Sequence, residues 1–264
     1  FHTVLSSWVL GAVFVIGISC WFLLKKRDKE FAVASIKIGA VFGLVASLLT
    51  VWTGDGSGYA IAQTQPMKLA AVEGYYEGQN GAGLVAVGLL NPEKKTYDDG
   101  QDPFLFRIEI PKMLSLLAER KVDAFVPGIK NIIEGGYELK DGTKALSAAE
   151  KIEKGKKAIA ALATYRTAKK EGDEAAAKEA YTTLQENVPY FGYGYIKDVN
   201  QLVPNVPLNF YAFRVMVILG GYFILFFILV LFFAYKKDLS KIRWMQYVAL
   251  WTIPLAYIAG QAGW

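Results

Sequence analysis

The single histidine of this chain and one of its four methionines are residue types that could bind a haem iron. His2 stands at the start of one apolar segment, and Met216 stands in another. An imidazole together with a thioether forms an axial ligand pair of low-spin haems, in which the thioether raises the reduction potential. Because the chain has one His and one Cys, a metal site built from several histidines and an internal disulfide are both excluded.

Arg214 lies two residues before Met216. A guanidinium inside a membrane span is costly unless it is paired, and a haem propionate would be a fitting partner because Arg binds a carboxylate through a planar fork. Each residue also has a simpler interpretation. His2 could bond to a backbone carbonyl at the membrane interface, Met216 could serve packing alone, and Arg214 could extend its side chain to the outer surface.

Gln65, Lys68 and Glu73 form a second polar group around Pro66, a residue that suits a helix start. Five residues along a helix correspond to a rotation of about 140°, so Lys68 and Glu73 would flank a cleft instead of forming an i,i+4 ion pair. Quinol oxidation requires a proton acceptor, which a carboxylate provides, and donors to the ring oxygens, which Lys or Gln provides. The alternative is an ordinary charge pair on the surface.

The elements that carry these residues are predicted to be membrane helices. The chain of 264 residues is 53% hydrophobic and has a mean hydropathy of +0.27. Long apolar runs with few charges occupy residues 1–24, 31–53, 207–235 and 244–264. Since a helix of about 20 apolar residues crosses the ~30 Å hydrocarbon core, the sequence predicts four transmembrane helices in a lipid bilayer.

The distribution of charge predicts the orientation of these helices. Residues 54–206 carry a net charge of −2, whereas the rest of the chain carries +7, concentrated in the short connections near 25–29 and 236–243. Short basic loops stay in the cytoplasm, so 54–206 is predicted to be periplasmic and the chain to be a multi-pass protein of a bacterial inner membrane. The sequence has no basic patch interleaved with aromatic residues, so nucleic acid is not expected as a partner.

This orientation places His2 and Met216 at a similar depth. His2 lies 23 residues before Lys25, and Met216 lies 20 residues before Lys236. These separations correspond to about 34 Å and about 30 Å of helix. Both side chains should therefore lie near the outer surface, as two ligands of one haem require.

The predicted fold is an all-α membrane protein with four transmembrane helices. One pair occupies 1–53, a second pair occupies 207–264, and a large, mainly helical periplasmic segment occupies 54–206 between them. The chain starts without Met, and both of its ends lie in apolar segments. We therefore expect it to be a piece of a longer protein.

Within the outer segment, glycines and prolines predict the local structure. We expect a turn at 54–58 that ends the second span, and a loop over the Gly- and Asp-rich stretch 78–103. Helices are expected to begin at Pro66 and to cover 111–120, 144–168 and 173–187.

The segment from Gly54 to Glu73, GDGSGYAIAQTQPMKLAAVE, resembles the start of the quinol-binding loop in the cytochrome bd quinol oxidase subunit I family. The resemblance is strong across the four apolar segments and weak over about 80–200. The flanking motifs that agree with it are FHTV at 1–4, GIS at 17–19, KKRD at 25–28, FRVM at 213–216, IP at 253–254 and AGW at 262–264.

The resemblance implies a haem site. His2 and Met216 fall on the family's ligands to a low-spin haem b near the outer surface, and Arg214 falls on the family's arginine close to that haem.

The resemblance also implies a quinol site. Lys68 and Glu73 fall on loop residues implicated in quinol binding, with Gln65 and Tyr59 as weaker matches. The Gly74-Tyr75-Tyr76 that follows Glu73 departs from the family's usual Ala-containing continuation.

The implied activity is that of a quinol:oxygen oxidoreductase. Such an enzyme oxidises ubiquinol or menaquinol at the outer face and passes electrons through haem b to a high-spin haem b and a haem d. Oxygen is reduced there with protons from inside, which generates a proton motive force. The ligands of these two further haems fall outside this chain, so both haems are expected only in the full-length protein, together with a second membrane subunit.

Two other functions fit the same composition. A membrane transporter or channel could line its pathway with an intramembrane His and Arg. A membrane-tethered binding module could use the helical outer segment. A transporter would show flux without bound haem, which distinguishes it from an oxidase.

Overall fold

The chain divides into two compact units. The computed structural model describes residues 1–263, so Trp264, the last residue of the AGW motif, lies outside the described residues. The first unit, here called the membrane unit, comprises residues 1–60 and those from 208 onward. The second, the loop unit, comprises Ile61–Pro207.

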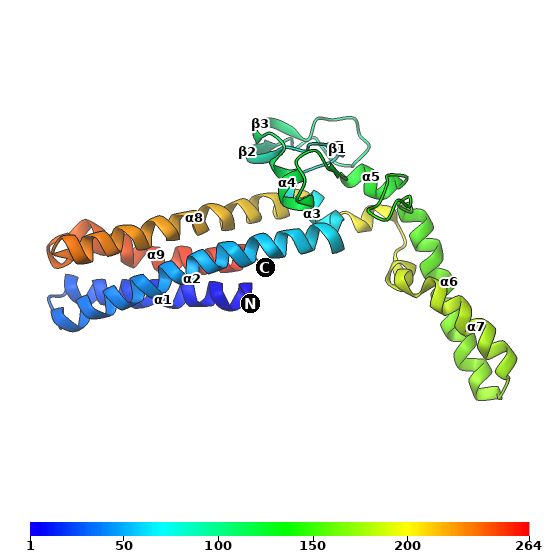
Figure 1. The fold of residues 1–264 in the computed structure, drawn as a ribbon, viewed down its shortest axis with the longest axis horizontal. Helices are drawn as coiled ribbons and strands as arrows, with labels where there is room; N and C mark the ends of the chain where they lie inside the picture. The colour runs from blue at the N-terminus through cyan, green and yellow to red at the C-terminus, as the bar shows by residue number, and fades with distance from the viewer. Residues whose placement is uncertain (264) are drawn as a thin grey trace. The chain divides into compact units, whose positions relative to one another are not determined.

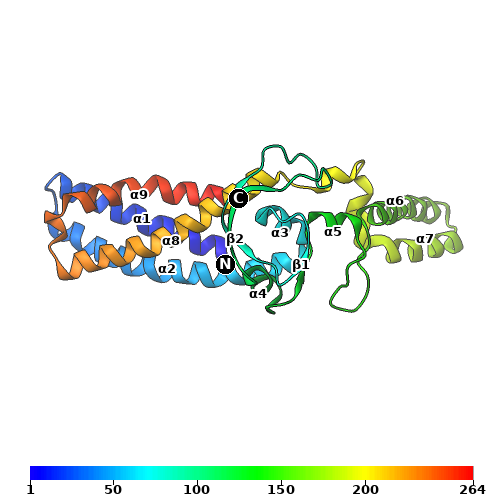
Figure 2. The same cartoon turned by 90° about the horizontal axis from the view of Figure 1, so that it is seen from above.

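Four long helices run side by side in the membrane unit (Figures 1 and 2). The connections after α1 and after α8, the latter containing the 3₁₀ turn η3 (Leu239–Lys241), lie at one end of this unit (Figure 1). The start of α1 and the end of α9 lie at the other. The four helices are α1 (His2–Leu24), α2 (Lys29–Thr64), α8 (Val206–Lys236) and α9 (Arg243–Ala262).

Three helices among the described residues are long and apolar enough to cross a membrane: His2–Leu24, Lys29–Thr64 and the segment Val199–Lys236 that ends with α8. The chain is therefore a mostly helical membrane protein with three candidate spans. The expected fourth span, α9, has 20 residues and polar positions such as Gln246 and Gln261. Its crossing of the membrane stays a prediction.

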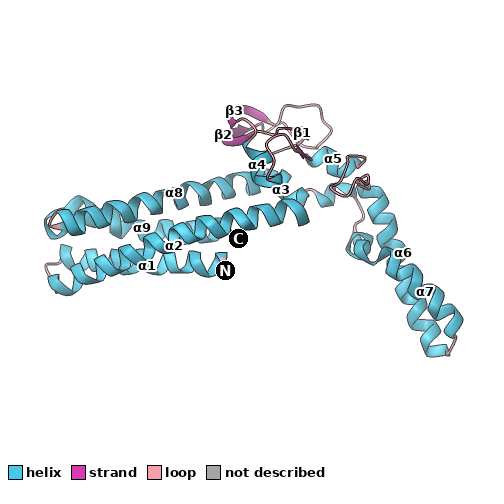
Figure 3. Cartoon of the chain, viewed as in Figure 1, coloured by secondary structure: helices cyan, strands magenta, loops and turns pink. Residues whose placement is uncertain are grey.

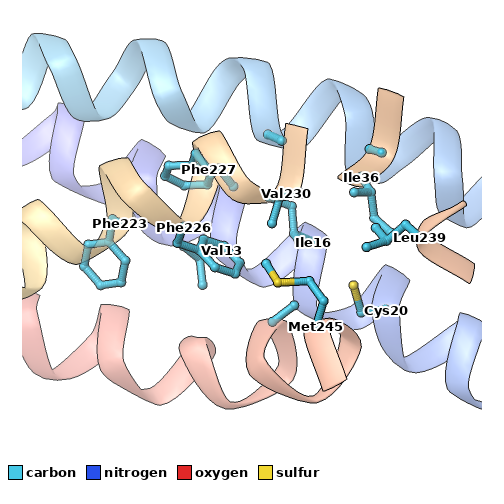
Figure 4. Packing of buried hydrophobic residues seen from close by; sticks show 14 of the residues in the cluster. Val13, Ile16, Cys20, Ile36, Phe223, Phe226, Phe227, Val230, Leu239 and Met245 are labelled. Carbon is cyan, nitrogen blue, oxygen red and sulfur yellow. The ribbon is translucent and has the colours of Figure 1, made fainter. Parts of the chain in front are cut away.

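Buried apolar side chains from all four helices form one core in the membrane unit (Figure 4). A Cβ built at Gly43 would overlap the ring of Phe227, and one at Gly17 would lie 2.6 Å from Cδ1 of Ile253. These glycines let α2 approach α8, and α1 approach α9, as small residues do between membrane helices. The core residues labelled in Figure 4 are Val13, Ile16, Cys20, Ile36, Phe223, Phe226, Phe227, Val230, Leu239 and Met245.

The turn expected at 54–58 is wrong, because α2 continues through these residues to Thr64. Glycine permits a turn without enforcing one. A helix that has already formed adds residues at little cost, so α2 propagates through the three glycines of this segment. As a result, Thr53 and Gly54 are helical residues in the middle of α2 and not the end of a span.

The loop unit is mainly helical but contains strands, so the expectation of an all-helical fold is wrong in this respect (Figure 3). Two antiparallel pairs form, and in one of them Leu84 lies opposite Ile110. Two of the strands, at 79–80 and 84–90, fall within the expected loop 78–103. The longer one forms because its Val and Leu residues make a short run between Gly- and Asp-rich stretches. The paired strands are β1 (Gln79–Asn80) with β4 (Phe125–Val126), and β2 (Leu84–Leu90) with β3 (Phe104–Ile110).

The four helices expected in the loop unit are confirmed, with ends that differ by a few residues. α3 begins at Pro66, and α4, α6 and α7 match the other three expected ranges. The helical elements are α3 (Pro66–Glu73), α4 (Met113–Glu119), α5 (Ile129–Glu134), α6 (Ala148–Glu171), α7 (Glu174–Asn187) and the 3₁₀ helices η1 (Val188–Tyr195) and η2 (Val199–Leu202).

The helices α6 and α7 form a hairpin, in which specific residues cap the start of each helix and end α6 (Figure 2). Ser147 caps α6 by accepting a hydrogen bond from the Glu150 N–H (3.2 Å), and the Glu150 carboxylate accepts one from the Ser147 N–H (2.7 Å). The Ser147 N–H and the Ser147 hydroxyl, which both lie within hydrogen-bond distance of the Glu150 carboxylate, lower the pKa of Glu150. Gly172 ends α6 at a φ of 77°, and Asp173 caps α7 by accepting from the Ala176 N–H.

Asp99 organises the connection between β2 and β3. Its carboxylate accepts hydrogen bonds from the Lys94 ammonium (2.6 Å) and from the backbone N–H groups of Lys95 (2.7 Å), Thr96 (3.0 Å) and Gln101 (3.0 Å). Led by the Lys94 bond, these donors hold the pKa of Asp99 well below its ordinary value. The ionised carboxylate therefore stabilises this connection.

Asp99→Asn is expected to loosen this connection at neutral pH, because the amide has no charge for Lys94 and one acceptor oxygen fewer. Since the pKa of Asp99 is depressed in the folded state, its stabilisation is full above the unfolded value near ~4 and is lost as pH falls through the folded pKa. Hydrogen exchange of the three bonded amides should be faster in the variant at neutral pH, and variant and wild type should converge in acid. The exposed neighbour supplies the control, since Asp98→Asn should exchange as wild type does. Equal protection in both variants would contradict the assignment.

Candidate functional site

His2 lies at the start of α1, against α2. Its Nδ1 atom is 3.2 Å from Oγ1 of Thr53, and a Cβ built at Gly54 would lie 3.1 Å from its Cε1 atom. The side chain is partly buried. The ring is therefore held against α2 by a hydroxyl, in space that a glycine leaves open.

Met216 of α8 also borders a glycine. A Cβ built at Gly263, just after the end of α9, would lie 2.9 Å from the Met216 Sδ atom. Since a Cβ atom does not approach a non-bonded sulfur so closely, it is the missing side chain of Gly263 that leaves room for the thioether. Met216 is partly buried, as His2 is.

The two candidate ligands lie at the same end of the membrane unit. His2 is the first residue of α1, which ends at Leu24, about 33 Å along the helix axis. Met216 is about 30 Å from Lys236, the last residue of α8. Both are thus far from the end that carries the two short connections (Figure 1). The helix bounds agree with the predicted match in depth, and ligation of one haem by this pair stays a prediction.

The side chain of Arg214 folds back along α8. Its Nη1 donates to the backbone carbonyl of Phe210 (3.2 Å), and its guanidinium carbon lies 3.4 Å from the centroid of the Phe210 ring. A cation over an aromatic face is stabilised, and more so away from water. Arg214 and Met216 are about 200° apart around the helix, so these two side chains do not share one face of α8.

Gln65, Lys68 and Glu73 are grouped by α3. Gln65 is the residue at the N-cap, and its backbone carbonyl accepts a hydrogen bond from the Lys68 N–H (2.9 Å). Lys68 is exposed, whereas Glu73, the last residue of the helix, has 3% of its surface exposed. The two charged residues therefore meet different environments, and their expected position on two sides of a cleft stays a prediction.

Gly74 ends α3 directly after Glu73. Its φ of 61° lies in the left-handed region that favours glycine, which gives the departure from the family pattern a structural role. The following carbonyls, of Tyr75 and Tyr76, accept hydrogen bonds from the first amides of α5 (3.0 and 2.9 Å). Glu73 is thus fixed at a helix C-terminus that is joined to a second helix. Burial raises the pKa of Tyr75 to about 12, so the neighbouring phenol stays protonated at neutral pH.

Tyr59 lies on α2 within the membrane unit and is partly buried. Its expected grouping with the α3 residues stays a prediction.

Thr53, Gly54 and Gly263 were not predicted to belong to the site. A signal for Thr53 exists in the sequence, because it lies 24 residues after Lys29 and thus at the depth of His2. Hydropathy does not fix the rotation of each helix about its axis, however, so it could not show that Thr53 faces His2. For the same reason, hydropathy could not show that Gly263 lies against Met216.

The comparisons with known proteins agree with the resemblance seen in the sequence. The family model of cytochrome bd terminal oxidase subunit I matches residues 1–264. Cytochrome bd-II ubiquinol oxidase subunit 1 of Escherichia coli is 32% identical over 281 residues, which cover 100% of this chain and 50% of that protein. Cytochrome bd ubiquinol oxidase subunit 1 of Bacillus subtilis is 24% identical and is matched over 100% of this chain and 43% of its own length.

Among solved structures, bd oxidase from Geobacillus thermodenitrificans is similar, with a TM-score of 0.64 at 20% sequence identity. The match covers 100% of this chain and 44% of that one, and it supports the fold. The chain spans about half the length of the curated relatives that it matches. Because the family model matches the chain from end to end, the chain belongs to the cytochrome bd terminal oxidase subunit I family.

Proposed function

We propose that this chain forms the part of a bd-type quinol:oxygen oxidoreductase that oxidises quinol and holds the low-spin haem b. The observation that carries the proposal is the position of His2 and Met216 at one end of one four-helix unit, in a chain that belongs to this family. Two relatives are named ubiquinol oxidase subunits, which supports a quinol as substrate.

The residues present fit a low-spin haem. His2 offers an imidazole nitrogen and Met216 a thioether, and both are neutral ligands. Gly54 and Gly263 give the two candidate ligand side chains room to lie against their backbones. The resemblance places Arg214 close to the haem, but its guanidinium lies against Phe210, on another face of α8 than Met216, so the side chain would have to leave this ring to pair with a propionate. When bound, the haem supplies a one-electron carrier whose reduction potential the thioether raises.

The α3 residues would bind and deprotonate the quinol. Oxidation of one quinol to the quinone releases two protons and two electrons, and a carboxylate oxygen of Glu73 would take up the protons one at a time. A carboxylate at the negative end of a helix dipole attracts donors such as the quinol hydroxyls. Lys68 and Gln65 would donate hydrogen bonds to the ring oxygens, and the Tyr59 hydroxyl would be a further polar contact.

The membrane topology follows from the charges. The basic connections after α1 and α8 would lie in the cytoplasm, with α9 as the fourth span and the loop unit on the periplasmic side of a bacterial inner membrane. Protons released from quinol would leave on that side. The full-length protein would bind the high-spin haem b and haem d as well, and a second membrane subunit would complete the oxidase.

A reduced-minus-oxidised optical spectrum of membranes that contain the full-length protein, with quinol as the reductant, tests this function. We expect a low-spin haem b band together with oxygen consumption that depends on quinol. A full-length protein that binds no haem, or that carries solute across the membrane without it, would contradict the proposal and favour a transporter.

A further inference from the structure

We propose that Thr53 is a positioning residue that sets the tautomer of His2 and directs its Nε2 atom to the haem iron. This inference rests on the proposed haem ligation and assigns a role to a residue outside the ligand pair. Its basis is the contact between Nδ1 of His2 and Oγ1 of Thr53, 51 residues apart in the sequence.

The hydrogen bonds of Thr53 decide the direction of this contact. A hydroxyl has one proton to donate. The Thr53 hydroxyl lies 2.9 Å from the carbonyl oxygen of Leu49 and 3.3 Å from that of Thr50, and both oxygens can only accept. Because the hydroxyl proton is directed to these carbonyls, the oxygen is left to accept from His2, whose Nδ1 must then carry the proton.

The tautomer of His2 follows. A neutral imidazole carries one N–H, so a proton on Nδ1 leaves the lone pair on Nε2. Nε2 is therefore the nitrogen available to iron. Histidine ligands in metal sites commonly donate their second nitrogen to such an acceptor, which fixes the ring orientation and raises the basicity of the ligand.

Gly54 is the second residue of α2 that contacts the imidazole ring of His2. The ideal Cβ position at Gly54 is 3.1 Å from Cε1 and 3.6 Å from Nδ1 of His2, so the ring edge lies directly on this residue. A side chain at this position would push the imidazole away from the Thr53 hydroxyl. Thr53 and Gly54 together therefore hold the ring at a fixed distance from α2.

Thr53→Val in the full-length oxidase tests the role, because Val keeps the shape of Thr and removes the acceptor of the Nδ1 proton. The weaker imidazole donor stabilises ferric iron less, so the midpoint potential of the low-spin haem should rise. Haem affinity should fall by about 10–100-fold, the usual cost of losing such a partner. Spectroelectrochemical titration measures the potential, and the haem content of the purified protein reports the affinity.

Two matched variants separate positioning from a merely structural effect. Thr53→Ser keeps the hydroxyl and should restore the wild-type potential. Thr50→Val removes a hydroxyl that bonds to the Ala46 carbonyl (2.8 Å) one turn along the same helix and should leave the potential unchanged. A wild-type potential and haem affinity in Thr53→Val, or equal shifts in Thr53→Val and Thr50→Val, would overturn the inference.

His2→Ala distinguishes failure of this inference from failure of the proposed function. If His2→Ala keeps the low-spin band, the haem ligation itself is wrong. If His2→Ala loses the band while Thr53→Val retains the wild-type potential, only the role of Thr53 is wrong. The bands of the other haems in the full-length protein report whether each variant has folded.

Discussion

Replacing Met216 by Leu in the full-length protein is expected to abolish the low-spin haem b band. Leu has nearly the volume of Met, so the exchange costs less than about 1.5 kcal/mol of packing free energy. It has no sulfur lone pair, however, and the iron would keep a single axial protein ligand and become high-spin. The reduced-minus-oxidised spectrum measures the effect, which should approach the full amplitude of the band.

Met245→Leu is the matched control for this result. Met245 is also a methionine of the membrane unit, but it is 1% exposed and lies in the apolar core, so its substitution should leave the band intact. His2→Ala should reproduce the effect of Met216→Leu, because loss of either ligand breaks the pair. An unchanged band in Met216→Leu would refute the ligand assignment, and loss of the band in the Met245→Leu control would show that the substitutions act on packing.

The second large effect is expected from Glu73→Gln, which should slow quinol oxidation by about 10²–10⁴-fold while the haem spectrum persists. The amide has the shape of the carboxylate, but it cannot take up a proton at neutral pH. A positioned acid or base contributes a rate factor of this size. Quinol-dependent oxygen consumption, normalised to haem content, measures the loss.

Glu77→Gln controls for a general effect of charge in this region. Glu77 follows Glu73 by four residues and has a side chain that is 80% exposed, with Lys130 at 3.9 Å. Its substitution should leave turnover unchanged. Normal turnover in Glu73→Gln, at wild-type haem content, would remove Glu73 from the proposed quinol site without affecting the haem assignment.

The long helices of the membrane unit could be predicted because lipid imposes a local rule. Each backbone polar group in hydrocarbon must be satisfied within its own segment, so a long apolar run forms a helix whatever its neighbours are. α1 accordingly ends just before the basic cluster at Lys25, and α8 ends at Lys236. The helix ends place His2 and Met216 at the same end of the membrane unit.

Other features could not be predicted because they depend on contacts between distant segments. The glycines and the aspartate of the 54–58 segment predict a turn, yet the segment is helical within α2. β2 forms by pairing with β3. The short apolar run at β2 does not show in the sequence which other segment it pairs with. Residue type and spacing selected His2, Met216 and the α3 residues as candidates, and the family resemblance implied their roles. Thr53 emerged only once α1 was packed against α2.

The hairpin of α6 and α7 supplies a place to attach a label. Residues 169–175 at its tip are all exposed, and an insertion between Gly172 and Asp173 keeps both the glycine that ends α6 and the aspartate that caps α7. Exposed tips between self-sufficient elements tolerate insertions. An epitope or a small fluorescent tag inserted between Gly172 and Asp173 should therefore leave both helices folded, and an antibody fragment bound there would give electron microscopists a fiducial.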